Sequence, residues 1–513
     1  MDSAFGDSLR LVSVCDSARL IGQFVVSAGR SRGPREWVTD RIGEWFLCRH
    51  PALPLIRLVG VEGGPLGWIL GYPISEAGRL LSDHEVLQLP PQALASTEAL
   101  ETFIYSFGGR FAVVVSDARH RRLYLDPCGS LSAVYCAHQR MVASTPNLIP
   151  YDDHTRDRVE LAQAIGIPHT NGMYPFGLTP RYGIERILPN HYLDLSEWQT
   201  VRHWPKQAWQ EATCVEDTVA EIATLVKRNI AAIVAATPSY LPLTAGWDSR
   251  MLLACAKEWA YRLELFTTEI GDKGATIDCD TARRIAKRLK LRHRVLPKED
   301  AREEDLGEWM FRISYSTGEV RGWQSATMYK RLPSGRAVLV GNIGDLGRRH
   351  LWWGRGNNAE TSLIAPERLI ELCRCPPVEP ALARARAWLE SVPTAEVLQV
   401  LDLAYIEQRL GCWAGVFPYA ECDPGFTVFP LCHREIIERI LKLPVPYRRA
   451  GHLPRDIINR EWSTLLEWPV NQPIGAARLR LGVKKAISEA VAAWGRAESG
   501  IIKWRGTIAG SVR

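Results

Sequence analysis

The change of pattern near Pro205 constrains the fold more than any other feature of the sequence. Before it, short β-branched or aromatic runs such as residues 58–61 and 111–115 are bounded by Gly, Pro or Asp, which is typical of hairpins in an antiparallel sheet. After it, strand-like and helical stretches alternate, and apolar positions three and four residues apart mark a helix over residues 219–233. This order predicts an antiparallel amino-terminal half followed by a parallel α/β sheet with helices on both faces.

The second half contains four strand candidates, at residues 240–243, 263–267, 294–296 and 337–341. A helical pattern over residues 282–289 separates the second candidate from the third, and from about residue 360 the chain is mostly helical in character. A chain of 513 residues suits two domains, or three. We place the boundary near residues 205–215 and divide the chain into domains 1–208 and 209–513.

The composition is that of a globular protein, with 46% hydrophobic and 23% charged residues. The net charge of +6 is small for this length and does not require nucleic acid or a membrane as partner. The 12 cysteines are scattered as in a reduced cytosolic protein, and the one close pair, Cys373 and Cys375, lacks the further ligands of a zinc site. Residues 1–7 do not resemble a signal peptide, and no apolar run approaches the ~20 residues of a membrane helix. We therefore expect a cytoplasmic protein.

The segment best suited to chemistry is Thr-Ala-Gly-Trp-Asp-Ser-Arg at residues 244–250, between the strand candidate 240–243 and an apolar helical stretch. A small-residue turn that opens a helix exposes backbone N–H groups at the positive end of the helix dipole. The hydroxyls of Thr244 and Ser249 would add donors for phosphate oxygens, and Asp248 can orient the loop or reach Mg²⁺. Alone, the pattern is equally that of an ordinary capped helix.

This segment resembles the pyrophosphate loop of the asparagine synthetase family, normally Ser-Gly-Gly-x-Asp-Ser. Further stretches that are similar to family motifs follow in the family's order, at residues 107–112, 123–130, 184–193, 278–293, 340–345, 429–431 and 443–444. They match in turn the Gly-x-Phe-Ala and Asp-x-x-Gly series, the Leu-Pro-Pro-Gly-His stretch, a helix after the loop, the acidic turn, and the Val-Pro-Phe-Leu-Asp and Leu-Pro pair. The resemblance covers roughly residues 100–445. It rests on the order of the motifs, which is the same as in the family.

The resemblance implies an amino-terminal glutaminase-like (Ntn-type) α/β/β/α sandwich and a carboxyl-terminal parallel α/β ATP-pyrophosphatase (PP-loop) synthetase domain. Family chemistry adenylates a carboxylate with ATP and Mg²⁺, releases pyrophosphate, and lets an amine attack to form an amide. By this resemblance, Asp248 and Asp345 would hold Mg²⁺. The residues expected to bind ATP and its pyrophosphate are Thr244, Ala245, Gly246, Asp248, Ser249, Thr267 and Gly341.

The amino terminus departs from the family. Its glutaminases use a cysteine at the mature amino terminus as nucleophile and base, whereas this chain has Asp2 at that position and its first cysteine at Cys15. We therefore expect no glutamine hydrolysis. Two family lineages share this loss, the β-lactam synthetases and the lasso peptide cyclases, and both join an amine and a carboxylate of one substrate.

The synthetase motifs also depart. Ala245 replaces the first loop glycine, which adds a methyl group where phosphate should approach the backbone. Trp247 is interpreted first as a core aromatic and otherwise as a neighbour of adenine or peptide. Asn342 stands where the family's acidic turn begins, which leaves Asp345 as the metal candidate, with a helix cap as its alternative. Cys432 replaces the aspartate of the late motif.

Two further residues join Asp248 as catalytic candidates. Arg480 lies in a stretch similar to the one that supplies a catalytic lysine to β-lactam synthetases. Lys484 and Lys485 are alternatives for that position. The stretch can equally be interpreted as a solvated helix end without a catalytic role. Glu319, in a glycine-flanked polar loop, is a candidate for the substrate amine, although an exposed loop glutamate is ordinary. The basic run 283–293 is interpreted as a solvated helix face and not as a nucleic-acid contact.

The preferred function is an ATP-dependent, AMP-forming amide ligase without glutamine hydrolysis, of the lasso peptide macrolactam type. The 18 tryptophans could line a cleft for a peptide. The expected partners are a peptide or small carboxylate substrate, and for the lasso type a precursor peptide and a processing peptidase. The alternatives are an asparagine synthetase using free ammonia, a β-lactam synthetase, and a relative that binds nucleotide or a partner without turnover. Asn342 replaces a tyrosine that the β-lactam synthetases need. A tRNA-modifying enzyme fits poorly, because Cys373 and Cys375 lack the expected neighbours.

Overall fold

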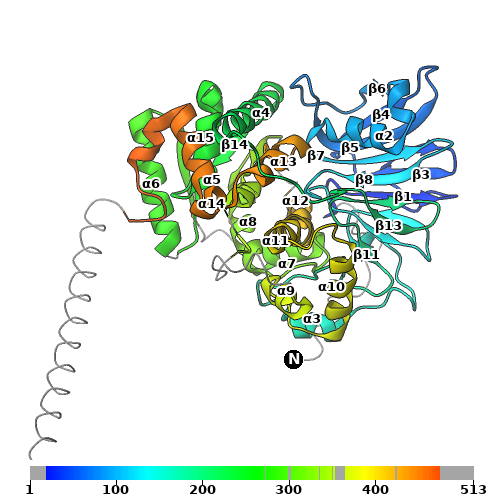
Figure 1. The fold of residues 1–513 in the computed structure, drawn as a ribbon. Helices are drawn as coiled ribbons and strands as arrows, with labels where there is room; N and C mark the ends of the chain where they lie inside the picture. The colour runs from blue at the N-terminus through cyan, green and yellow to red at the C-terminus, as the bar shows by residue number, and fades with distance from the viewer. Residues whose placement is uncertain are drawn as a thin grey trace, which may run out of the picture.

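The computed structural model describes residues 19–473 except 272, 298–301, 334, 349, 353–363 and 422–424. Over these residues the protein is a mixed α/β structure with three sheets (Figure 1). Two sheets belong to the amino-terminal half, and the third belongs to the carboxyl-terminal half.

The first sheet has six antiparallel strands in the order β11-β9-β10-β1-β3-β2. In chain order these are β1 (Phe24–Ala28), β2 (Val38–Ile42), β3 (Trp45–Arg49), β9 (Val134–Cys136), β10 (Met141–Ala143) and β11 (Glu185–Arg186). The second sheet has seven strands in the order β13-β12-β8-β7-β5-β4-β6, of which only β4 and β6 pair in parallel. These are β4 (Leu55–Val59), β5 (Pro65–Ile74), β6 (Val86–Gln88), β7 (Gly108–Ser116), β8 (Arg121–Leu125), β12 (His191–Asp194) and β13 (Gln199–Arg202).

These two sheets face each other across an apolar core. Trp45 of the first sheet and Trp68 and Val114 of the second are fully buried in it. Helix α2 (Thr97–Tyr105) covers the outer face of the seven-stranded sheet and buries Leu100 there. The predicted hairpins are confirmed, since β4 pairs with β5 and β7 with β8 in antiparallel register.

The third sheet has five parallel strands in the order β16-β15-β14-β17-β18, as the alternation of patterns predicts. They are β14 (Ser239–Pro242), β15 (Leu263–Glu269), β16 (His293–Pro297), β17 (Ala337–Leu339) and β18 (Phe426–Val428). Only β18 was not expected, because three residues within a helical region carry too short a pattern to identify a strand.

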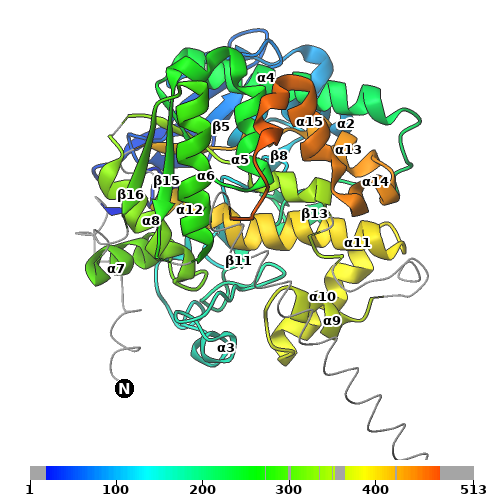
Figure 2. The same cartoon turned by 90° about the vertical axis from the view of Figure 1, so that its left-hand side faces the viewer.

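Helices cover the parallel sheet on both faces. On one face, α4 (Val215–Ala236), α5 (Trp247–Cys255) and α6 (Lys273–Leu289) share an apolar cluster with the strands. On the other, Leu332 at the end of α8 (Val320–Arg331) packs against the strands. Helix α15 (His452–Trp462) lies against α5 although about 200 residues separate them in sequence (Figure 2).

The remaining helices include a π-helix that directly continues α11. The α-helices are α3 (Val159–Ile165), α7 (Glu303–Arg312), α9 (Pro366–Leu372), α10 (Glu379–Ser391), α11 (Val397–Ala404), α12 (Phe417–Ala420), α13 (Arg434–Lys442) and α14 (Val445–Ala450). The π-helix η8 (Tyr405–Trp413) follows α11, and the 3₁₀ turn η6 (Asn342–Arg348) follows β17. The predicted helical character beyond residue 360 is therefore confirmed.

The two halves share one apolar cluster across the predicted boundary at residues 208 and 209. The ring of Tyr72 stacks on that of Phe426 with centroids 4.0 Å apart. The amide of Gly109 donates to the carbonyl of Cys432 at 2.8 Å. The predicted domain boundary lies in residues 203–214, which connect β13 and α4. Because the apolar core continues across this connection, the division into two domains stays a prediction.

Candidate functional site

The order of the parallel strands locates a ligand crevice. Strands β15 and β16 lie on one side of β14, and β17 and β18 lie on the other, so the chain changes sides between β16 and β17. In open α/β sheets, ligands bind outside the carboxyl ends of the strands at such a switch point. The segments that leave β14 and β17 there are residues 243–249 and 340–348.

The predicted pyrophosphate loop is a closed turn held by its own hydroxyls. The amide of Thr244 donates to Ser249 Oγ at 3.0 Å, and the two hydroxyls lie 2.8 Å apart. The amide of Gly246 donates to Thr244 Oγ1 at 3.1 Å. No described side chain caps the start of α5, which leaves the amides of its first turn open to a ligand.

Two side chains support the backbone of this loop. Asp278 on α6 accepts a hydrogen bond from the amide of Ala245 at 2.7 Å. Arg250, which is fully buried, donates to the carbonyl of Ala245 at 2.9 Å. The same guanidinium reaches the carbonyls of Trp468 and Pro469, both at 2.7 Å, and so ties a distant segment to the loop. Burial lowers the pKa of Arg250 to about 10, so it remains charged at neutral pH.

Ala245 and Trp247, the two departures discussed for the loop, both pack against the protein, Ala245 fully buried and Trp247 partly buried. Ala245 is fully buried, so its methyl group packs inside and leaves the open side of the loop unobstructed. Trp247 packs against the main apolar cluster, as its interpretation as a core aromatic predicts.

The two predicted metal ligands meet on one guanidinium nitrogen. Nη2 of Arg348 donates to both carboxylate oxygens of Asp248, at 2.8 and 2.6 Å. The same atom donates to Asp345 Oδ1. A Cβ added to Gly344 would lie 2.5 Å from Asp248 Oδ1, so only glycine lets the turn after β17 approach this carboxylate.

The carboxylates differ in electrostatic environment. Burial raises the pKa of Asp248 to about 6, against the opposing charge of Arg348. Burial also raises the pKa of Asp345, but the hydrogen bond from His350 and the charge of Arg348 outweigh it and lower that pKa below its ordinary value. His350 Nδ1 lies 3.3 Å from Asp345 Oδ2. At neutral pH both carboxylates therefore carry charge.

These residues fit a hard divalent cation. Mg²⁺ prefers oxygen ligands and is usually bound through one or two carboxylates plus substrate phosphates. Asp248 and Asp345 supply such oxygens, and both already turn towards a single cationic atom of Arg348. Within the described ranges no group of three or more His, Cys, Asp and Glu residues forms an all-protein metal site.

A cavity of about 270 Å³ opens beside the two carboxylates. Its walls come from the predicted site, from α8, from η8 and from the amino-terminal half. The lining residues are Asn171, Asp248, Val320, Arg321, Gln324, Asn342, Asp345, Tyr405, Arg409, Leu410, Trp413 and Ala414.

Other predicted site residues lie around this centre or outside the described chain. Gly341 follows β17 and approaches Asp248, with 3.1 Å between its added Cβ and that of Asp248. Thr267 is buried, and its hydroxyl donates to the carbonyl of Leu243 at 2.6 Å, which links the ends of β15 and β14. Arg480 and its alternatives Lys484 and Lys485 lie outside the described residues.

Glu319 is not brought into the cavity. It precedes α8, and its carboxylate lies 3.6 Å from Nδ1 of His169 in the amino-terminal half. The next residues, Val320 and Arg321, line the cavity instead.

Sequence reasoning missed Arg348 and the residues of η8. Arg348 stands three residues after Asp345, a spacing that allows pairing but does not demand it. Tyr405, whose hydroxyl donates to the carbonyl of Asn342 at 2.7 Å, lies in a helical region with no distinguishing motif.

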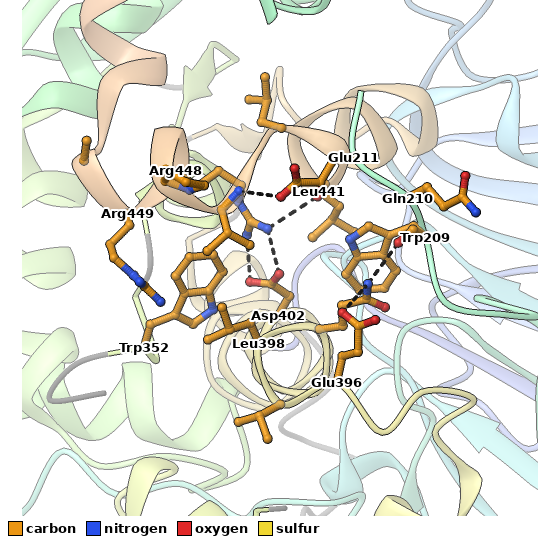
Figure 3. A pocket seen from close by; sticks show the side chains of 16 residues that line it. Trp209, Gln210, Glu211, Trp352, Glu396, Leu398, Asp402, Leu441, Arg448 and Arg449 are labelled. Carbon is orange, nitrogen blue, oxygen red and sulfur yellow. Dashed lines mark hydrogen bonds and ion pairs between the residues drawn. The ribbon is translucent and has the colours of Figure 1, made fainter. Parts of the chain in front are cut away.

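A larger cavity of about 1,200 Å³ lies between residues 209–211 and helices α11, α13 and α14. Figure 3 shows Asp402 and Arg448 facing each other in it, and they are joined by hydrogen bonds of 2.7 and 2.8 Å. Arg448 also donates to the carbonyl of Leu346 in η6 at 2.8 Å. This buried pair therefore supports the turn that carries Asp345.

The chain was compared with models of known protein families and with curated proteins, and neither comparison found a match. Among the described helices, none combines the length and the apolar character needed to cross a membrane.

Proposed function

We propose that this protein is an ATP-dependent, AMP- and pyrophosphate-forming amide ligase with the architecture of a glutaminase-inactive asparagine synthetase relative. In this proposal the amino-terminal sandwich is a glutaminase-like (Ntn-type) domain without glutaminase activity, and the parallel sheet belongs to a PP-loop synthetase domain. The supporting observation is that the loop 244–249, which carries Asp248, lies beside Asp345 at the switch point of the parallel sheet.

The loop would bind the phosphates of ATP. The hydroxyls of Thr244 and Ser249 now bond to each other and can turn to phosphate oxygens together with the open amides of α5. These donors would stabilise the charge that grows on the departing pyrophosphate. Asp278 and Arg250 hold the backbone of the loop in place while its hydroxyls turn.

Mg²⁺ held by Asp248 and Asp345 would neutralise phosphate charge when bound. Arg348 must then release at least one of these carboxylates, and its freed guanidinium would face the phosphates.

The proposed chemistry balances in two steps. A carboxylate oxygen of the substrate attacks the α-phosphorus, the bond to the bridging oxygen breaks, and pyrophosphate leaves with the electron pair. The amine then attacks the acyl carbon of the adenylate, AMP leaves with the electron pair of the acyl–oxygen bond, and the amine proton passes to solvent. AMP is a far better leaving group than hydroxide, which makes the amide accessible in water.

We propose a substrate that supplies its own amine, in the manner of a lasso peptide precursor closed to a macrolactam in the cytoplasm. The large cavity has the half-buried indole of Trp209 on its wall, and this aromatic surface suits contact with a peptide. A precursor peptide and a processing peptidase would be its partners.

One observation favours a second candidate, a relative that binds nucleotide without turnover. Arg348 donates hydrogen bonds to both carboxylates. The first amide of the loop, that of Thr244, already donates to the hydroxyl of Ser249. If Arg348 never withdraws, ATP would bind without being activated.

Exchange of labelled pyrophosphate into ATP tests the proposal, with glutamate- and aspartate-containing peptides as acids. We expect acid-dependent exchange that Asp248→Ala abolishes, because the variant lacks a cation ligand and the partner of Arg348. Asp280→Ala, at an exposed aspartate on α6 paired with Arg283 at 3.7 Å, should exchange like the wild type. Full exchange by folded Asp248→Ala would refute the proposed site, and ATP binding without exchange under any acid would support the second candidate.

A further inference from the structure

The wall of the small cavity opposite Asp248 is built by a π-helix. Tyr405, Arg409 and Trp413, spaced four residues apart along η8, all line it. π-Helical turns are rare and occur frequently at functional sites. These three residues have no role in the ATP site proposed above.

Arg409 differs from the other two arginines near the cavity. Arg348 is neutralised by two carboxylates, and Arg321 bonds to Gln324 at 2.9 Å and approaches Glu421 to 3.7 Å. No hydrogen bond or ion pair joins Arg409 to a described residue; its guanidinium stacks instead over the ring of Trp413, 3.4 Å from the centroid. Burial lowers the pKa of Arg409 to about 10, so it is a cation at neutral pH.

Arg409 feels the charge of Asp345 but has no carboxylate hydrogen-bonded to it among the described residues, so it favours an anionic ligand. Desolvation of a charge is unfavourable unless an opposite charge accompanies it. The planar guanidinium stacked on an indole is preorganised to bind a carboxylate through two parallel hydrogen bonds.

The cavity limits the size of that carboxylate. A volume of 270 Å³ equals roughly nine times the ~30 Å³ that one water occupies in the liquid. This volume is large enough for one acidic side chain. Asn171, from the amino-terminal half, adds a polar side chain to the lining of the cavity.

We propose that Arg409 is the specificity-determining residue for the acid substrate, binding the side-chain carboxylate of a glutamate or aspartate and presenting it to the nucleotide site. This inference rests on the proposed function for the fate of the bound acid, but the binding itself does not need turnover.

Calorimetry on the full-length protein tests the binding with N-acetyl-L-glutamate N-methylamide and the matching aspartate compound. The corresponding glutamine and asparagine compounds are isosteric neutral controls. We expect the wild type to bind an acid at least about tenfold more tightly than its amide, since hydrogen bonds to charged groups are the stronger ones. Arg409→Gln should remove this preference and Arg409→Lys should retain part of it, while both bind ATP like the wild type.

Arg386→Gln is the matched control, because Arg386 is exposed on α10 and pairs only with Glu379, at 3.0 Å, among described residues. Equal binding of acid and amide by the wild type, or an unchanged preference in Arg409→Gln, would overturn the inference. If the wild type binds the acid through Arg409 but shows no pyrophosphate exchange with it, the proposed function fails while the carboxylate site stands.

Discussion

Asp248 and Asp345 illustrate what a sequence can and cannot say about single residues. The resemblance predicted that both would hold Mg²⁺, and in the structure both carboxylates accept hydrogen bonds from one atom of Arg348. The role of Arg348 could not be predicted, because a basic residue in a turn pairs with whichever carboxylate the tertiary fold brings near. The need for glycine at position 344 is likewise visible only in the fold, where an added Cβ would lie 2.5 Å from Asp248 Oδ1.

The pKa of Asp248 predicts a pH dependence of nucleotide binding. Burial raises this pKa to about 6, so the carboxylate becomes protonated as the pH falls through 6 and no longer serves as a cation ligand. We expect the affinity for ATP with Mg²⁺ to fall by up to about tenfold per pH unit below 6. Protonation of this group favours the folded protein in that window, because its pKa is higher than in the unfolded chain, so the loss of affinity is not unfolding.

Titration of ATP affinity from pH 8 to pH 5 at constant Mg²⁺ measures this effect. Asp248→Asn serves as the reference, since its remaining pH dependence reports the protonation of the phosphates themselves. Identical pH profiles of the wild type and Asp248→Asn would contradict the assignment of the titrating group.

At the scale of elements, strands were predicted where continuous apolar runs fit a buried parallel sheet, and β14, β15, β16 and β17 are confirmed. The π-helix η8 could not be predicted, because its residues have the same apolar spacing as an ordinary helix and its wider turn arises from tertiary contacts. Those contacts come from the amino-terminal half. Gln408 accepts from the amide of Phe176 at 2.6 Å, and Gly411 packs against Pro189.

Glu407 anchors η8 most strongly to the amino-terminal half. This fully buried carboxylate accepts hydrogen bonds from Arg202 at 2.6 and 2.8 Å and from Asn190 at 2.9 Å. Trp388 adds another at 2.6 Å. The amino-terminal sandwich therefore has a structural role, which is to hold the helix that carries Arg409.

Glu407→Gln should destabilise the protein by about 3–5 kcal/mol, the usual cost of removing one partner of a buried ion pair. The variant leaves the charge of Arg202 buried without compensation. Unfolding in urea measures the loss, with Glu390→Gln at an exposed position of α10 as the control. A change below about 1 kcal/mol would show that the network does not anchor η8.

At the scale of the whole molecule, the sequence predicted the order of the two halves but not how closely they are joined. The pattern change near Pro205 lies between β13 and α4. An apolar cluster and the stacked rings of Tyr72 and Phe426 nevertheless join the halves. Cys432 donates its thiol to Asp126 across the same junction at 3.1 Å. Residues so far apart in sequence give no local signal of their contact.

The central claim is that the turn around Gly246 binds the phosphate chain of ATP while Asp248 and Asp345 hold its cation. A crystal structure of the protein with ATP and Mg²⁺ tests it most directly. The account predicts the β- and γ-phosphates on residues 244–249, the ion on both carboxylates, and Arg348 withdrawn from at least one of them. A triphosphate located elsewhere, or no bound nucleotide at a saturating concentration, would contradict it.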